Sequence, residues 1–165
     1  MDPPTGEPSE SSVCDARRAR IHVHLRVPSD LRFTDLFHLV LGQLAHEIQI
    51  PEERMDWVTL CLREAVNNAV LHGNKKDSSK FIEVEMDEVE GEFVMTVWDE
   101  GPGFNVSVLG DPRNPENLFR PNGRGIFLIR QLMDHVEFIH DSRGRFGLEM
   151  KIALSKKDKQ EAANE

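Results

Sequence analysis

The sequence predicts an α/β (α+β) two-layer sandwich, in which one mixed, mostly antiparallel sheet is covered on one face by helices. Three observations favour this fold class. One alternating stretch, residues 21–27, comes first, two stretches with helical periodicity follow over 29–49 and 51–73, and two hairpins then occupy 81–98 and 136–154. Strands and helices that each carry one apolar face bury those faces against each other, which produces two layers around one core.

The first strand and the first helix are predicted from alternation and capping. Residues 21–27 place apolar side chains at every second position, so His22 and His24 share the other face of the strand. Two histidines at this spacing can bind a metal, but without a third ligand nearby we expect exposed strand residues. Ser29 is the expected cap of a helix that runs to about Gln49. The periodic face of this helix consists of Leu36, Leu39, Val40, Gln43, Leu44 and Ile48.

The second helix carries the first candidate functional pair. Pro51 begins it, and Gly73 is expected to end it as a left-handed cap. Glu64 and Asn68 stand four residues apart, so a helix places both on one face. A carboxylate beside a carboxamide suits a site where a base orients a nucleophile and an amide oxygen holds a hard cation. Taken alone, the pair is more typical of a solvated helix surface, and Asn67 competes with Asn68 for the role of the amide.

Two glycine-containing motifs follow downstream. An apolar strand leads into Asp99-Glu100-Gly101-Pro102-Gly103-Phe104, and Gly123-Arg124-Gly125 opens an apolar periodic helix. Glycines at such junctions let backbone N–H groups approach a ligand, and a helix N-terminus favours an anion. An acceptor at a strand end, such as Asp99, can take a hydrogen bond from an exocyclic amine. Each motif is weak alone, but their order after the Glu64 and Asn68 helix makes a far more specific set.

The segment between these motifs, residues 105–122, is long, irregular and rich in Pro, Asn, Gly and Asp. A loop of this length within a compact domain is usually functional or mobile. Arg113 and Arg120 are either cations for a phosphate group or merely solvated side chains. The helix that follows is expected to reach Asp134, and the hairpin over 136–154 completes the chain of elements.

Length and composition bound the function. The 165 residues fit one domain, expected over 20–155, with a disordered tail at 1–19 and a frayed end at 156–165. A formal charge of −9 argues against a nucleic-acid binder. There is no apolar run of about 18 residues and no signal-peptide core, and Cys14 and Cys61 form neither a metal motif nor a disulfide framework. A cytoplasmic protein is therefore expected.

The ordered set of motifs resembles the GHKL ATPases, the superfamily of gyrase, Hsp90, histidine kinases and MutL. E-A-V-N-N-A, beginning at Glu64, is similar to the N-box, D-E-G-P-G-F to the first glycine box, and G-R-G-I-F-L-I to the second. Within this superfamily, residues 64–73 and 128–134 are most similar to the stand-alone serine kinases that act as bacterial anti-sigma factors. The resemblance covers roughly residues 20–155 and implies the Bergerat ATP-binding fold.

The resemblance implies a role for each site residue. Asp99 would accept the adenine amine, while Gly101 and Gly103 would let the backbone pass close to the base and sugar. Asn68 would hold Mg²⁺, and Glu64 would be the base that orients an incoming hydroxyl toward the γ-phosphate of ATP. The phosphates would meet main-chain N–H groups of Gly123, Arg124 and Gly125, under a lid formed by residues 105–122.

The implied function is that of an ATP-dependent serine/threonine kinase and anti-sigma factor. Its partners would be a STAS-type anti-sigma-factor antagonist, which it phosphorylates, and a sigma factor; a homodimer is possible. An alternative is an ATP-binding partner-switch module with little kinase activity. This rival gains weight because Gly147-Leu148 stands where many relatives have Gly-Thr, and the lost hydroxyl would cost about 1 kcal/mol of nucleotide affinity.

A third reading, a catalytic fragment of a histidine kinase, is disfavoured by spacing. His46-Glu47 superficially resembles a phospho-acceptor box, but it lies too close to Glu64 for a separate dimerisation hairpin. We expect His46 to be an ordinary histidine on a helix surface.

Overall fold

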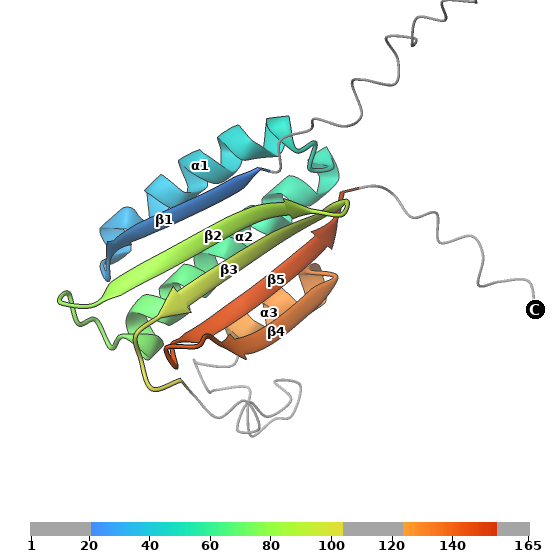
Figure 1. Cartoon of the computed structure of the whole chain (residues 1–165). Helices are drawn as coiled ribbons and strands as arrows, with labels where there is room; N and C mark the ends of the chain where they lie inside the picture. The colour runs from blue at the N-terminus through green and yellow to red at the C-terminus, as the bar shows by residue number, and fades with distance from the viewer. Residues whose placement is uncertain (1–20, 104–123, 155–165) are drawn as a thin grey trace, which may run out of the picture.

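The computed structural model describes residues 21–103 and 124–154, which form one sheet and a layer of helices (Figure 1). The sheet has five strands in the order β1-β2-β3-β5-β4. All four pairings between neighbouring strands are antiparallel, so the sheet is more uniform than the mixed sheet expected from the sequence. The strands are β1 (His22–Pro28), β2 (Phe81–Val89), β3 (Glu92–Asp99), β4 (His135–His140) and β5 (Phe146–Ala153).

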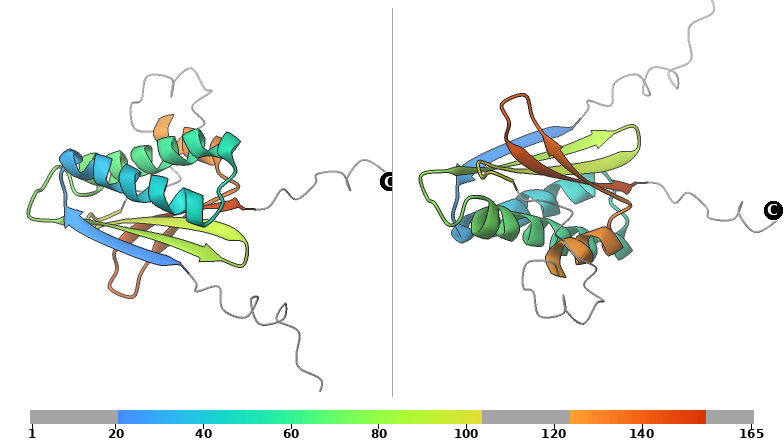
Figure 2. Two further views of the ribbon diagram at one scale, coloured as in Figure 1. Left: turned by 90° about the horizontal axis from the view of Figure 1, so that it is seen from above. Right: turned by 90° about the horizontal axis from the view of Figure 1, so that it is seen from below.

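The helices cover one face of this sheet, as both views in Figure 2 show. The central helix α2 packs against α1 and against α3. The predicted two-layer sandwich and the predicted order of elements are therefore confirmed. The helical segments are η3 (Leu31–Phe33), α1 (Thr34–Glu47), α2 (Glu52–Asn68), the π-helical turn η4 (Ala69–Gly73) and α3 (Arg124–Leu132).

The first helix begins later than predicted, and Ser29 is not its cap. The backbone N–H of Ser29 donates to the carbonyl oxygen of Lys80 at 2.9 Å, which keeps this residue in the extended segment after β1. Asp30 is instead the N-cap of the helical turn that follows, because its Oδ1 accepts a hydrogen bond from the backbone N–H of Arg32 at 2.9 Å. The chain then makes the short 3₁₀ turn η3 before α1 starts at Thr34.

The buried face of α1 also differs from the predicted one. The side chains of Phe37, Leu41 and Ala45 on α1 are buried. Those of Leu36 and Leu39 on the same helix are 40% and 73% exposed. Both faces of α1 carry apolar residues, so periodicity alone did not distinguish the face that meets the sheet. The prediction is therefore right for Ile48, which is buried, and for Val40 and Leu44, which pack against the core, and wrong for the exposed residues Leu36, Leu39 and Gln43.

The core lies between the two layers and is centred on α2. Strands β2, β3 and β5 direct alternate side chains toward the helices, and α2 supplies the facing residues. Each large apolar side chain buried in this way contributes about 1.5–3 kcal/mol. Members that are less than 2% exposed include Val84, Met86, Met95, Met150, Ile152, Val58 and Leu62.

The opposite face of the sheet is polar. His22 pairs with Asp87 at 2.7 Å and His24 with Glu83 at 2.9 Å, so the two histidines are exposed strand residues as expected. Glu83 also accepts from Arg145 at 2.7 Å. Burial raises the pKa of Glu83, but the hydrogen bonds from Arg145 and His24 outweigh burial and leave this pKa below its usual value.

None of the helices in the described part of the chain has the length and apolar character needed to cross a membrane.

Candidate functional site

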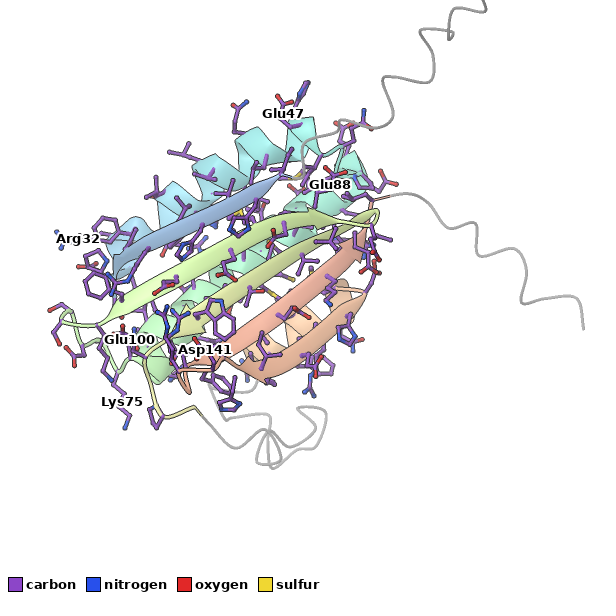
Figure 3. The ribbon with its side chains drawn as sticks, viewed as in Figure 1. Arg32, Glu47, Lys75, Glu88, Glu100 and Asp141 are labelled. Atoms are coloured by element: carbon purple, nitrogen blue, oxygen red, sulfur yellow. The ribbon has the colours of Figure 1, made fainter. Side chains whose placement is uncertain are left out.

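A pocket opens between the helix layer and the end of the sheet where β3 finishes. It brings together Asn68 of α2 and Asp99 of β3, two of the residues singled out from the sequence. Figure 3 shows the same end of the sheet, which carries the labelled residues Glu100 and Asp141, whereas Glu47 and Glu88 are labelled at the opposite end. The pocket walls are formed by Ala65, Asn68, Ala69, Gly73, Val97, Asp99, Ile126, Phe138, Phe146 and Leu148.

Asp99 is the buried polar group of this pocket. It is 6% exposed, and its Oδ1 accepts from the backbone N–H of Gly101 at 2.7 Å. Burial raises the pKa of Asp99 above its usual value, and the hydrogen bond from Gly101 offsets this only in part. A carboxyl group held in an otherwise apolar pocket is a specific acceptor for a ligand that presents an N–H group.

Gly73 lies directly against Asp99, and this contact corrects the prediction that Gly73 is a left-handed cap. A Cβ atom on Gly73 would overlap the carboxyl group of Asp99. The helix instead ends through the π turn η4, and the left-handed residues come afterwards, at Lys75 (φ 56°) and Lys76 (φ 61°). Glycine is required at position 73 because the strand end approaches the helix end too closely for any side chain.

Gly101 makes a second close approach, from which a stability prediction follows. A Cβ atom there would overlap the carbonyl oxygen of Gly73, a backbone atom that cannot rotate away. We expect Gly101→Ala to lower the free energy of unfolding by about 1–3 kcal/mol, the usual cost of overpacking. Gly42→Ala is the matched control, since nothing lies within 4 Å of a Cβ at this position in α1. The control should raise stability by about 0.5–1 kcal/mol in urea unfolding; equal stability of the two variants would contradict the prediction.

Asn74 ties the strand ends to the helix end and was assigned to a polar loop from the sequence. Its side chain is fully buried, donates from Nδ2 to the carbonyl oxygen of Phe81 at 2.9 Å and accepts on Oδ1 from the N–H of Glu100 at 2.8 Å. It therefore ties the residue that follows Asp99 to the start of the neighbouring strand β2. A polar residue between helix and strand carries no periodic signal, so the sequence pattern did not reveal this role.

Glu64 and Asn68 meet the start of α3. A Cβ atom on Gly125 would lie 2.7 Å from Oε2 of Glu64 and 3.2 Å from Nδ2 of Asn68. The glycine thus lets the first turn of α3 pass over both side chains. Nδ2 of Asn68 is buried and makes no hydrogen bond to the described residues. The predicted pairing of the two residues on one helix face, next to the second glycine motif, is confirmed.

The remaining predicted residues lie around this centre. Gly103 adopts a left-handed φ of 72°, and a Cβ on it would lie 2.9 Å from the ring of Phe146. Arg124 is the first residue of α3. The other predicted positions, Gly123 and the arginines Arg113 and Arg120, fall outside the described residues together with the rest of the segment 105–122.

Cys61 lies beneath Glu64 and does not supply a nucleophile. Burial, together with the negative charge of Glu64, raises the pKa of the Cys61 thiol to about 11. The thiol therefore stays protonated near neutral pH and is unreactive. The chemistry of the site thus depends on the carboxylate and the carboxamide on α2.

The arrangement has two halves with different chemistry. One half is an apolar pocket with a buried acceptor, which suits a flat aromatic ring that carries an amine. The other half joins a carboxylate, a carboxamide and a helix N-terminus, which suits phosphate groups and a divalent cation. Leu148 lines the first half, so the expected departure from Gly-Thr does fall in the pocket. Gly147 beside it lies against the Trp98 ring, where a Cβ would come within 2.7 Å of Cζ3.

Several known proteins are similar to this chain in sequence or in fold. RsbW of Bacillus mycoides, named a serine-protein kinase, is 26% identical over 125 residues, which are 72% of this chain and 78% of the relative. RsbW of Bacillus cereus is 23% identical over the same shares of the two chains.

Two solved structures are similar in fold. The RsbU and RsbW domains of a Mycobacterium tuberculosis protein match 81% of this chain with a TM-score of 0.58 and 17% identity, although this chain spans only 32% of that one. The SiaB–SiaC complex from Pseudomonas aeruginosa contains a chain that matches over 88% of this chain and 98% of its own length, with a TM-score of 0.53 and 13% identity. The sequence model of one protein family, the histidine kinase-like ATPase domain, matches residues 27–152, which is most of the chain. This chain therefore belongs to the family of histidine kinase-like ATPase domains.

Proposed function

We propose that this protein is an ATP-dependent serine/threonine-protein kinase that acts as an anti-sigma factor and phosphorylates a STAS-type antagonist. The observation that carries the proposal is the continuity of the site. One helix, α2, lines the Asp99 pocket with Asn68 and presents Glu64 beside the first turn of α3. A nucleotide base in the pocket would therefore direct its phosphates toward Glu64. The names of the RsbW relatives support the same activity.

In this proposal the pocket binds adenine and the start of α3 binds the phosphates. Asp99 accepts a hydrogen bond from the exocyclic amine, while Gly101 and Gly103 leave room for the base and sugar. The backbone N–H groups of Arg124 and Gly125 are in the first turn of α3, and the N-terminus of a helix favours an anion. Gly123 extends this set by resemblance to the family.

The residues on α2 fit a Mg²⁺ ion. The Nδ2 atom of the Asn68 carboxamide is buried and unpaired among the described residues, and the carboxamide oxygen is the kind of hard ligand that Mg²⁺ prefers. A bound Mg²⁺ would neutralise charge on the phosphates. Glu64 would accept the proton of a substrate hydroxyl. At the same time the hydroxyl oxygen would bond to the γ-phosphorus of ATP, and the bond between that phosphorus and ADP would break.

A transfer assay tests the proposal. The native chain, Mg²⁺ and γ-labelled ATP are incubated with purified STAS-domain proteins of its own organism. We expect acid-stable phosphoserine or phosphothreonine on one of them. Bound ATP without any transfer would instead support the rival, a partner-switch module with little kinase activity, which the apolar Leu148 in the nucleotide pocket favours. Acid-labile phosphate on a partner would point to a histidine kinase fragment.

The metal ligand is tested by calorimetry of ATP binding with Mg²⁺ and with EDTA. The native chain should bind ATP more tightly with Mg²⁺, and Asn68→Ala should lose most of this difference, because water replaces the missing protein ligand poorly. Asn67→Ala is the matched control and should keep the Mg²⁺ dependence. The opposite result, with Asn67→Ala losing it, would transfer the ligand role to Asn67.

The exposed face of α1 favours a homodimer. Leu39, 73% exposed, lies on the helix beside the edge strand β1, and Leu36 lies one turn before it. Among the described residues, nothing covers this apolar face or pairs with the outer edge of β1, and such a surface suits a second copy of the same chain. Leu39→Glu should lower the mass measured by light scattering from a dimer to a monomer, and Gln43→Glu on the same helix should not. A native chain that is monomeric at high concentration would contradict this.

Two further expectations complete the proposal. A sigma factor is the second protein partner, bound in the state in which the antagonist is phosphorylated. The domain is expected to span 20–155, between the two polar ends, and to work in the cytoplasm.

A further inference from the structure

The helix that carries Glu64 also exposes two large apolar side chains. Trp57 is 46% exposed and Leu60 is 38% exposed, although both belong to the central helix of the fold. In an α-helix, residues four and seven positions before Glu64 lie on the same side as Glu64. Leu60 and Trp57 occupy these positions, so they continue the surface on which the carboxylate stands, one and two turns away from it.

Helix α3 extends this apolar surface. The start of α3 meets Glu64 through Gly125, and its end meets Arg54, whose Nη2 donates to the carbonyl oxygen of Leu132 at 3.2 Å. The two helices therefore run antiparallel, and the middle of α3 lies level with residues 57–60 of α2. Leu128, one turn after Gly125, is half-buried there and does not belong to the core cluster.

We propose that Trp57, Leu60 and Leu128, which we name the docking strip, bind the protein that donates the acceptor hydroxyl. This inference rests on the proposed kinase function and adds where the substrate binds. The partner it fits is a folded protein whose acceptor serine or threonine is bordered by apolar surface side chains. A free amino acid or a short polar peptide would leave the docking strip uncovered.

The position of Glu64 makes this contact difficult to avoid. The acceptor hydroxyl must come within hydrogen-bond reach of Glu64, about 3 Å. Leu60 and Trp57 are only about 6 Å and about 10 Å along the helix from Glu64, at 1.5 Å per residue. A protein interface of ordinary size buries about 800 Å² on each side, a patch about 16 Å in radius. A protein centred near Glu64 would therefore cover both side chains.

The residues around the docking strip are those of an interface. Exposed charged residues border it on α2, among them Asp56 and Arg63. An exposed tryptophan with a polar rim is the usual composition of an interface hot spot. The leucines on α1 are a separate surface, because α1 and α3 pack on different sides of α2 (Figure 1).

The experiment compares Leu60→Glu on α2 with Gln43→Glu on α1, two charge insertions at exposed positions on neighbouring helices. Phosphate transfer to the purified STAS-domain proteins is measured at saturating ATP, and binding of the same proteins is measured by calorimetry. Leu60→Glu and Trp57→Ala should raise the KM for the protein substrate by about 30-fold, the effect of removing a hot-spot residue. The kcat at saturating substrate and the affinity for ATP should change little, and Gln43→Glu should leave KM unchanged.

Each other outcome is decisive. Transfer with an unchanged KM in Leu60→Glu overturns the docking strip and leaves the kinase intact. Absence of transfer, with STAS-protein binding that Leu60→Glu weakens and Gln43→Glu does not, overturns the kinase and keeps the docking strip. Absence of both transfer and binding by the native chain overturns both. A dimer that Leu60→Glu dissociates and Leu39→Glu does not would assign the docking strip to a second copy of this chain.

Discussion

Replacing Asp99 with Asn is expected to weaken ATP binding by about 100-fold and, at neutral pH, to make the protein more stable. The carboxyl group is the buried acceptor of the pocket, and a hydrogen bond to a charged group contributes about 1.5–3 kcal/mol. Asn has the same shape and can still accept from the N–H of Gly101. Its amide nitrogen, however, would face the amine of adenine, so a favourable contact becomes a repulsive one.

The gain in stability follows from the pKa of Asp99, which burial raises above the ordinary value of 3.8. The folded protein then holds this proton more tightly than the unfolded chain does. The stability that the protonated carboxyl contributes is fully present below 3.8 and is lost as the pH rises through the folded-state pKa. Asn carries no charge at any of these pH values and avoids the loss.

Thermal unfolding from pH 4 to pH 8 and calorimetry with ATP check both halves of this prediction. The stability advantage of Asp99→Asn over the native chain should grow as the pH rises above 3.8 and then level off. Asp87→Asn on the exposed face of the sheet is the control, and it should leave ATP affinity unchanged. Native ATP affinity in Asp99→Asn would remove Asp99 from the nucleotide site.

Replacing Glu64 with Gln is expected to lower the rate of phosphate transfer by about 10²–10⁴-fold, the contribution of a positioned general base. Gln keeps the size of the side chain beside Gly125 but does not accept the proton of the incoming hydroxyl. ATP affinity should stay close to that of the native chain, because the proposed contact with the base of the nucleotide is at Asp99, in the pocket that Asn68 also lines. Single-turnover transfer to the STAS-domain substrate measures the effect.

The control for this prediction is Glu53→Gln, an exposed carboxylate in the first turn of the same helix, which should transfer phosphate at the native rate. A Glu64→Gln variant that loses ATP binding together with transfer would show that Glu64 holds the nucleotide. Full activity would show that another group takes the proton, and the role of the base would have to be reassigned.

Local patterns in the sequence were enough to predict much of this protein. Alternation gave the strands at 21–27 and 81–98, and periodicity gave the helix that begins after Pro51, because burial on one face leaves a repeating trace in neighbouring residues. The pairing of Glu64 with Asn68 follows from helix geometry alone. The fold family was recognisable because its three motifs are short and lie in a fixed order.

The tertiary structure decided the features that join distant parts of the chain. Leu39 and Phe37 are both apolar and both helical, and only packing against the sheet shows that Phe37 is buried and Leu39 exposed. Gly73 meets Asp99, and Asn74 bridges Phe81 and Glu100, through contacts between segments that no local pattern records. The sequence by itself therefore determined the elements and the residue types of the site. Their distances, burial and pKa values depended on how those elements pack, because these quantities are set by neighbours far away along the chain.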